Sequence, residues 1–180
     1  MEKFRELLNQ KVYKLFLIVW PPLGEVNESD IDMSFGIVFL NRPNRLCIIS
    51  TNKEDMWTPY IRFEDLPNKI YCWSDFLYRK KNWMKYEEND NIIDEIEAEY
   101  YDLTECNLFK NIITSRINAI ELIRIENISE PFGVKILFTN DYILTTPISD
   151  GNTAETSKFN NNNNIAIFEK LGKLVIENIT

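Results

Sequence analysis

The 180-residue chain contains no histidine. Histidine is the commonest general base near neutral pH and the commonest metal ligand in proteins. Its absence excludes nucleophile pairs of the Ser–His and Cys–His types. Glycine is scarce as well: there are only five, and none lies in a glycine-rich phosphate loop or Walker pattern. The stretch Asp150-Gly151-Asn152-Thr153 is therefore interpreted as a turn, and no motif in the chain names a reaction.

Cysteine is also rare. Cys47, Cys72 and Cys106 lie far apart in the sequence and have no CxxC spacing. Their odd number argues against a framework of disulfides and favours a reducing compartment. We predict that all three are small buried hydrophobic residues.

Long apolar runs are absent from the chain. The longest, Leu15–Trp20, is far too short to cross a bilayer as a helix. The first residues, MEKFRELLNQ, lack the apolar core of a secretory signal. We expect a cytoplasmic protein with no membrane partner.

Basic residues are fewer than acidic ones. Lys and Arg number 20 against 28 Asp and Glu, which gives a net charge of −8. Such a chain is repelled by the phosphates of nucleic acids and attracted to basic proteins. We therefore expect no nucleic acid partner. A negative surface that only maintains solubility is the alternative explanation of the charge.

What the chain does contain is a repeated stretch. Residues 4–18 read FRELLNQKVYKLFLI and residues 109–123 read FKNIITSRINAIELI. Aligned without a gap, they share three identical positions, and six further positions carry similar residues. The identities are Phe4/Phe109, Leu17/Leu122 and Ile18/Ile123. Internal repetition of this kind indicates duplicated structural units. We predict one domain, 1–180, built from repeats 1–77 and 106–180 that an acidic segment, 78–105, connects.

Each repeat is predicted to begin with a short amphipathic helix, since apolar residues recur at helical spacing. A strand, a hairpin, a loop, a helical turn and a last strand are predicted to follow. The expected helices are 2–10 and 108–113, with a further one at 74–86; the expected strands are 12–20, 33–40, 46–50, 69–73, 117–126, 133–138, 142–146 and 174–179. The predicted fold class is α+β, with two duplicated helix-plus-antiparallel-sheet halves packed as one compact unit.

Residues 86–105 are strongly acidic: they contain nine carboxylates and no lysine or arginine. Ile93, Ile96, Tyr100 and Leu103 fit a helical stripe, whereas the alternation of Glu95–Tyr100 fits a strand. We favour the strand, which would project Glu95, Glu97 and Glu99 from one face.

A row of carboxylates on one face suits a docking surface for a basic partner, because opposite charges speed association. A solvated strand face and a divalent metal site are the alternatives. No calcium-loop spacing is present, so we predict no metal and no cofactor. Aromatic residues beside charge are typical of protein interfaces. The predicted partner-binding residues are Glu95, Glu97, Glu99, Asp102, Trp57 and Tyr100.

The order of features from Asp102 to Asp150 carries a resemblance. It comprises DLT, a short apolar helix, SRINAIELI, a strand opening FGVKILF, an Asn-Asp turn, a return strand and ISDGNT. This order resembles small bacterial immunity-type proteins of polymorphic toxin systems. The resemblance implies a non-enzymatic acidic protein that binds and blocks a cognate toxin.

Together these features predict a non-enzymatic cytoplasmic binding protein that docks a basic protein partner, most concretely a toxin-neutralising immunity protein. It would be a monomer or a homodimer. Two other functions stay open: a carboxylate-based metal-dependent hydrolase and a structural or homo-oligomeric module.

Overall fold

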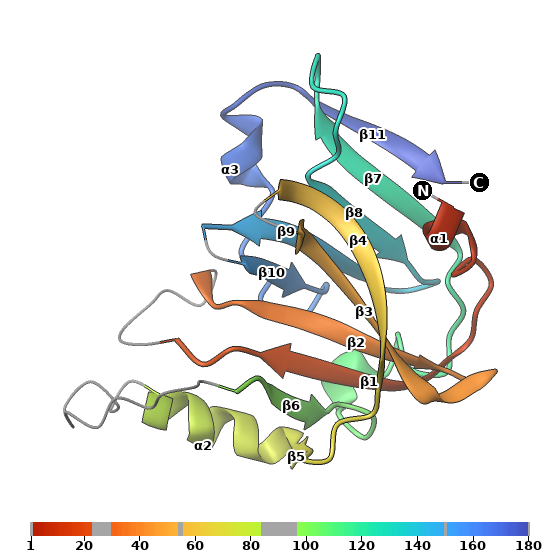
Figure 1. Ribbon diagram of the computed structural model, residues 1–180, viewed down its shortest axis with the longest axis vertical. Helices are drawn as coiled ribbons and strands as arrows, with labels where there is room; N and C mark the ends of the chain where they lie inside the picture. The colour runs from red at the N-terminus through yellow and green to blue at the C-terminus, as the bar shows by residue number, and fades with distance from the viewer. Residues whose placement is uncertain (1, 23–29, 54–55, 84–96, 150, 180) are drawn as a thin grey trace.

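The computed structural model describes residues 2–22, 30–53, 56–83, 97–149 and 151–179. The described strands form two sheets (Figure 1). Sheet 1 has the order β4-β3-β2-β1-β6-β5, from β1 (Val12–Val19), β2 (Met33–Phe39), β3 (Arg42–Lys53), β4 (Met56–Asp65), β5 (Tyr71–Cys72) and β6 (Glu99–Asp102). Sheet 2 has the order β10-β9-β8-β7-β11, from β7 (Ala119–Ile125), β8 (Gly133–Leu137), β9 (Tyr142–Ile148), β10 (Gly151–Glu155) and β11 (Leu174–Ile179). All neighbours pair antiparallel except β5 and β6.

The predicted fold, α+β with two duplicated helix-plus-antiparallel-sheet halves, is wrong, because the described structure is mostly β. The described α-helices are short: α1 (Glu2–Arg5), α2 (Trp73–Trp83) and α3 (Ala166–Glu169). The expected helix at 108–113 is a 3-10 turn, η3 (Asn107–Phe109), followed by further turns. Phe4, Leu7, Phe109 and Ile112 do have helical spacing, and all four are buried. These four side chains anchor turns to the core. They do not form the apolar face of a helix packed on a sheet.

Sequence patterns also missed two strands, β4 and β10. Residues 51–60 are polar enough to suggest a loop, yet most of them belong to β3 and β4, and β4 is an edge strand of sheet 1. The expected turn at Asp150–Thr153 becomes β10 from Gly151 onward. β10 consists of small and polar residues, all of them buried. Its burial depends on hydrogen bonds that polarity in the sequence does not reveal.

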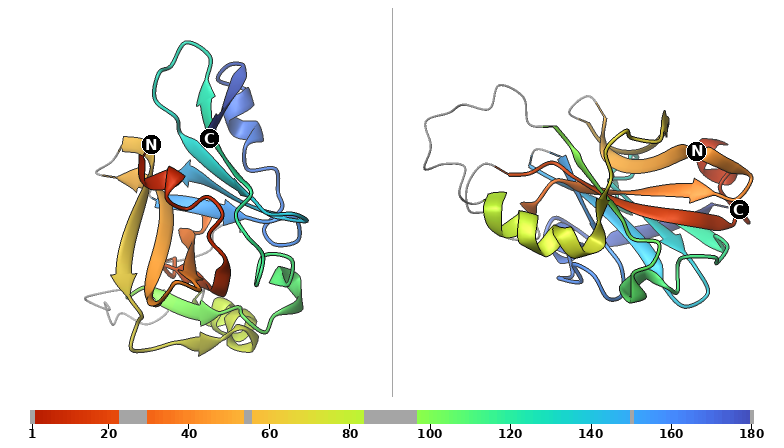
Figure 2. Two further views of the ribbon diagram at one scale, coloured as in Figure 1. Left: turned by 90° about the vertical axis from the view of Figure 1, so that its right-hand side faces the viewer. Right: turned by 90° about the horizontal axis from the view of Figure 1, so that it is seen from below.

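The core lies between the two sheets (Figure 2). Alternate residues of β1, such as Leu15 and Leu17, belong to the same apolar cluster as Ile120 and Leu122 of β7. Phe159 joins this cluster, packing edge-on to Phe35 with 6.1 Å between ring centres. β10 lies against β2 and β3, and β9 lies against β3. Smaller clusters occupy the outer face of each sheet.

The two repeated stretches pair with each other along a seam, which we define as residues 9–12 and 114–117. Lys11 and Arg116 oppose each other in an isolated antiparallel bridge. The hydrogen bonds around them are reciprocal. Asn9 N donates to Ile117 O at 2.9 Å, as Thr114 N does to Val12 O at 3.2 Å. Ile117 N donates to Gln10 O at 3.1 Å, as Val12 N does to Ser115 O at 2.9 Å. Equivalent residues of the two stretches therefore play equivalent parts at the seam.

A buried amide joins the two sheets at the other end of the sandwich. Asn152 of β10 donates through Nδ2 to Met33 O at 2.6 Å and to Ser34 Oγ at 3.0 Å. Its Oδ1 accepts a hydrogen bond from the Ser50 hydroxyl. A Cβ on the preceding Gly151 would lie 2.3 Å from the Asp32 carboxyl carbon, so only glycine fits this close approach.

The cysteines differ in environment, contrary to the expectation that all are buried. Cys47 is buried, Cys106 is half-buried and Cys72 is exposed at the edge strand β5. Burial raises the pKa of the Cys47 thiol to about 12. Among the described residues, no helix is long and apolar enough to cross a membrane.

Candidate functional site

The acidic row expected at Glu95, Glu97 and Glu99 does not form as predicted. Glu95 lies outside the described residues. Glu97 is exposed and precedes β6, whereas Glu99 begins β6 and is only 8% exposed. The strand interpretation is confirmed for residues 99–102. Its inward face, however, carries Glu99 into the protein.

Both carboxylate oxygens of Glu99 accept hydrogen bonds from neighbouring side chains. Arg79 donates to its Oε1 through Nη2 and, at 3.0 Å, through Nε. Its Oε2 accepts from Trp83 Nε1 at 3.1 Å and from the Tyr101 hydroxyl. The Arg79 guanidinium lies 4.0 Å from the centre of the Tyr71 ring. This network fastens α2 to β6, so Glu99 has a structural role.

The other residues predicted on β6 face outward. Tyr100 packs against the cluster on the outer face of sheet 1, and burial raises the pKa of its hydroxyl. Asp102 accepts a hydrogen bond from Thr104 N at 2.8 Å and so shapes the turn after the strand. The structure does not gather Glu99, Tyr100 and Asp102 on one exposed surface.

Trp57 occupies a different place: it lines a groove on the side of the molecule where β4, β9, β10 and α3 meet. This Trp57 groove has a volume of about 610 Å³, within the range of ligand sites in proteins. Its lining is Asp30, Trp57, Thr146, Pro147, Ile148, Ser149, Thr153, Asn162, Asn163, Asn164, Ile167, Phe168 and Leu171.

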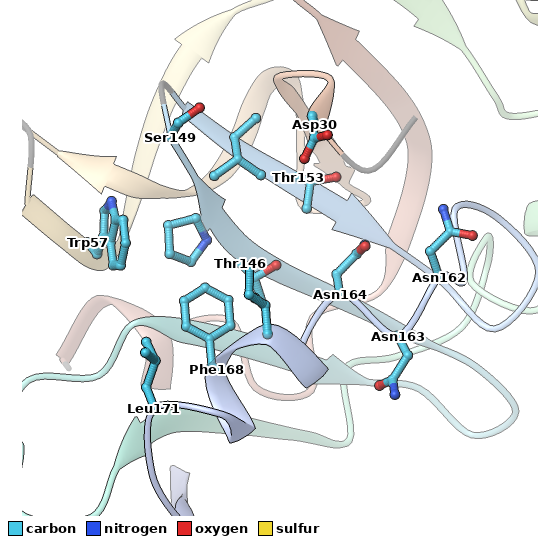
Figure 3. A pocket seen from close by; sticks show the side chains of 13 residues that line it. Asp30, Trp57, Thr146, Ser149, Thr153, Asn162, Asn163, Asn164, Phe168 and Leu171 are labelled. Carbon is cyan, nitrogen blue, oxygen red and sulfur yellow. The ribbon is translucent and has the colours of Figure 1, made fainter. Parts of the chain in front are cut away.

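The apolar end of the groove has a supported floor and an exposed rim. Phe168 stacks on Phe132 with 4.1 Å between ring centres and meets the Trp57 ring edge-on at 6.1 Å. In Figure 3, Trp57, Phe168 and Leu171 lie together at one end. Trp57 is 48% exposed, and Leu171 and Ile167 are 64% and 62% exposed. The packed rings of Phe132 and Phe168 therefore support a rim of large apolar side chains that are exposed to solvent.

The polar end of the groove lies near Asp30, Thr146, Thr153 and Asn164 (Figure 3). Asn164 N donates to Oε2 of Glu155 at 3.3 Å, and the Tyr142 hydroxyl donates to Oε1 at 3.1 Å. Burial raises the pKa of Glu155. Burial, reinforced by the Glu155 charge, raises the pKa of Tyr142 to about 12. Buried Glu155 and half-buried Tyr142 thus support the wall of the groove through Asn164.

The loop that forms this wall is shaped by its own side chains. Thr156 Oγ1 accepts from Phe159 N at 3.1 Å, which turns the chain after β10. Asn160 Nδ2 donates to Thr153 Oγ1 at 2.9 Å and to Ala154 O at 3.0 Å. Asn160 and Asn163 adopt left-handed backbone conformations, with φ of 50° and 56°, which asparagine tolerates well. The run of asparagines at 160–164 therefore builds a defined wall.

Sequence reasoning singled out Trp57 but missed the rest of the groove. The asparagine run at residues 160–164 has no pattern that predicts a binding surface, and its position beside Trp57 depends on contacts between segments far apart in the sequence. One signal was available: Phe168 stands where Phe63 stands in the first repeat. This match predicted a helical turn in both repeats. A turn does form around Phe168, in α3, but Phe63 lies in strand β4, so the prediction is wrong for the first repeat. The match did not indicate which surface the turn at Phe168 lines.

Among the described residues, no group of three or more Cys, Asp or Glu side chains is placed to hold a metal ion. The site offers a concave surface with exposed aromatic and aliphatic side chains, amides and hydroxyls. Chemically, it can bind an amphipathic group by contact and hydrogen bonding. The chain matches no protein-family model, and the searches found no similar curated protein or solved structure.

Proposed function

We propose that this chain is a non-enzymatic binding protein that docks a basic protein partner, and that the Trp57 groove is the centre of its interface. The most concrete form of the proposal is a toxin-neutralising immunity protein. The observation that carries it is the exposure of Trp57, Ile167 and Leu171 around a groove with a rigid aromatic floor.

Such a groove suits protein recognition for an energetic reason. A few large side chains near the centre of an interface contribute most of the binding energy, and tryptophan is enriched among them. Trp57 is restrained by Phe168, so ordering it on binding costs little entropy. The net charge of −8 favours a basic partner and speeds its association.

The partner to test is the protein encoded by the neighbouring gene. Of that protein, the domain with the highest net positive charge is purified for the binding measurement. Surface plasmon resonance should give a dissociation constant for the pair, and association should slow as salt is raised. Trp57→Ala should weaken binding at least about tenfold, since it removes the central anchor. Leu171→Ala should weaken it by a smaller factor.

Leu77→Ala is the matched control, because Leu77 on α2 is 63% exposed and lies outside the groove lining. It should bind as the unchanged protein does. Equal affinities for Trp57→Ala and Leu77→Ala would remove the groove from the interface. Light scattering tests whether the groove instead binds a second copy of this chain. If the protein self-associates and Trp57→Ala abolishes the association, the groove is a homodimer interface and the proposal is contradicted.

A further inference from the structure

A second concave surface lies at the seam, and the charged side chains that line it are positive. It has a volume of about 380 Å³ and is lined by the cations Lys11 and Arg116, the amides of Asn9, Gln10 and Asn41, and two leucines. We call it the seam pocket. No carboxylate is among its lining residues, although acids outnumber bases in the whole chain by 28 to 20.

The two cations are held close together by backbone pairing. The hydrogen bonds between Gln10 and Ile117 and between Val12 and Ser115 flank the Lys11–Arg116 bridge. This pattern makes Lys11 and Arg116 a non-hydrogen-bonded antiparallel pair, whose side chains project to the same side at the shortest cross-strand spacing. Like charges directly opposite each other destabilise such a pair.

The described residues provide no counter-charge for this pair. Neither Lys11 nor Arg116 forms an ion pair with a carboxylate in the part of the chain that the structure describes. Arg116 Nη1 donates to Asn9 O at 2.7 Å, which orients the guanidinium without neutralising it. Gln10 Nε2 donates to Glu6 O at 3.2 Å. The remaining N–H groups of Arg116 and the Lys11 ammonium are left to bind an external acceptor.

We propose that the seam pocket binds an oxyanion, a carboxylate or a phosphate carried by a small molecule or a partner. A planar guanidinium beside an ammonium group matches the several oxygens of such an anion and forms charge-assisted hydrogen bonds to them. Binding would also relieve the repulsion within the pair. The proposal is independent of the Trp57 groove.

The test is thermal unfolding at constant pH and ionic strength in three salts: sodium chloride, sodium phosphate and sodium succinate. The unchanged protein should melt about 3 °C higher in phosphate or succinate than in chloride. A response to phosphate alone assigns a phosphate, and a response to succinate alone assigns a carboxylate. The doubly substituted Lys11→Gln, Arg116→Gln protein should melt at the same temperature in all three salts.

Two further variants sharpen the result. Lys11→Gln alone should raise the melting temperature in chloride, since it removes the repulsion, and should lose the response to the oxyanion. Lys110→Gln removes an exposed lysine outside the pocket and should keep the full response. The proposal is overturned if the unchanged protein melts equally in all salts, or if the double variant responds as the unchanged protein does.

Discussion

At the scale of single residues, Glu99 shows how a carboxylate predicted at the surface becomes part of the core. Its two oxygens accept hydrogen bonds from Arg79, Trp83 and Tyr101. Glu99→Gln places an amide N–H₂ group against these donors and leaves the Arg79 charge without its partner. We expect a loss of about 2–3 kcal/mol in the free energy of unfolding, measured by urea denaturation. Glu97→Gln, at an exposed position, should change it by less than about 0.5 kcal/mol.

Glu155 gives a pH dependence with a definite sign. Burial raises its pKa in the folded state, so the folded protein binds the proton more tightly than the unfolded chain does. From about pH 4.3 up to that raised pKa, the free energy of unfolding therefore falls as pH rises. Glu155→Gln is neutral throughout. The stability of the variant relative to the unchanged protein should increase between about pH 4 and pH 7. A difference that is constant across this range in urea unfolding would contradict the assignment.

At the scale of elements, the seam turns use the same backbone geometry with different residues. Asn9 has φ of 62° and the equivalent Thr114 has φ of 65°. The left-handed conformation is costly for a β-branched residue and much less so for asparagine. Thr114→Asn should therefore raise the free energy of unfolding by about 0.5–1 kcal/mol. Asn9→Thr should lower it by a similar amount, and two variants with effects of the same sign would refute this explanation.

Sequence patterns predicted the strands whose residues are apolar and missed those whose burial depends on polar contacts. β1 and β2 were predicted within one residue of their ends, because their runs of branched and aromatic residues have no other stable environment. β10 was missed because Asn152, Thr153 and Glu155 are polar residues buried through hydrogen bonds. Asn152 bonds to Met33, which is far away in the sequence, whereas Thr153 and Glu155 bond to the nearer Asn160 and Tyr142. The groove was missed because its parts are far apart in the sequence: Trp57 and Phe168 are separated by more than a hundred positions.

At the scale of the whole molecule, the two proposed sites face different directions. In Figure 1, α3 and the start of β4, which border the Trp57 groove, lie on the left. The turn between β2 and β3, which borders the seam pocket, lies on the right, as does α1, which precedes the lining residues 8–11. The groove offers apolar contact to a basic partner, and the pocket offers positive charge to an anion.

The reciprocal bonds of the seam also constrain when the protein can fold during its synthesis. Asn9 and Val12 find their partners only after residues 114–117 have left the ribosome. At about 5–20 residues per second, a ribosome needs on the order of 5–20 s to make the intervening chain. During that time residues 9–12 lack their backbone partners at the seam.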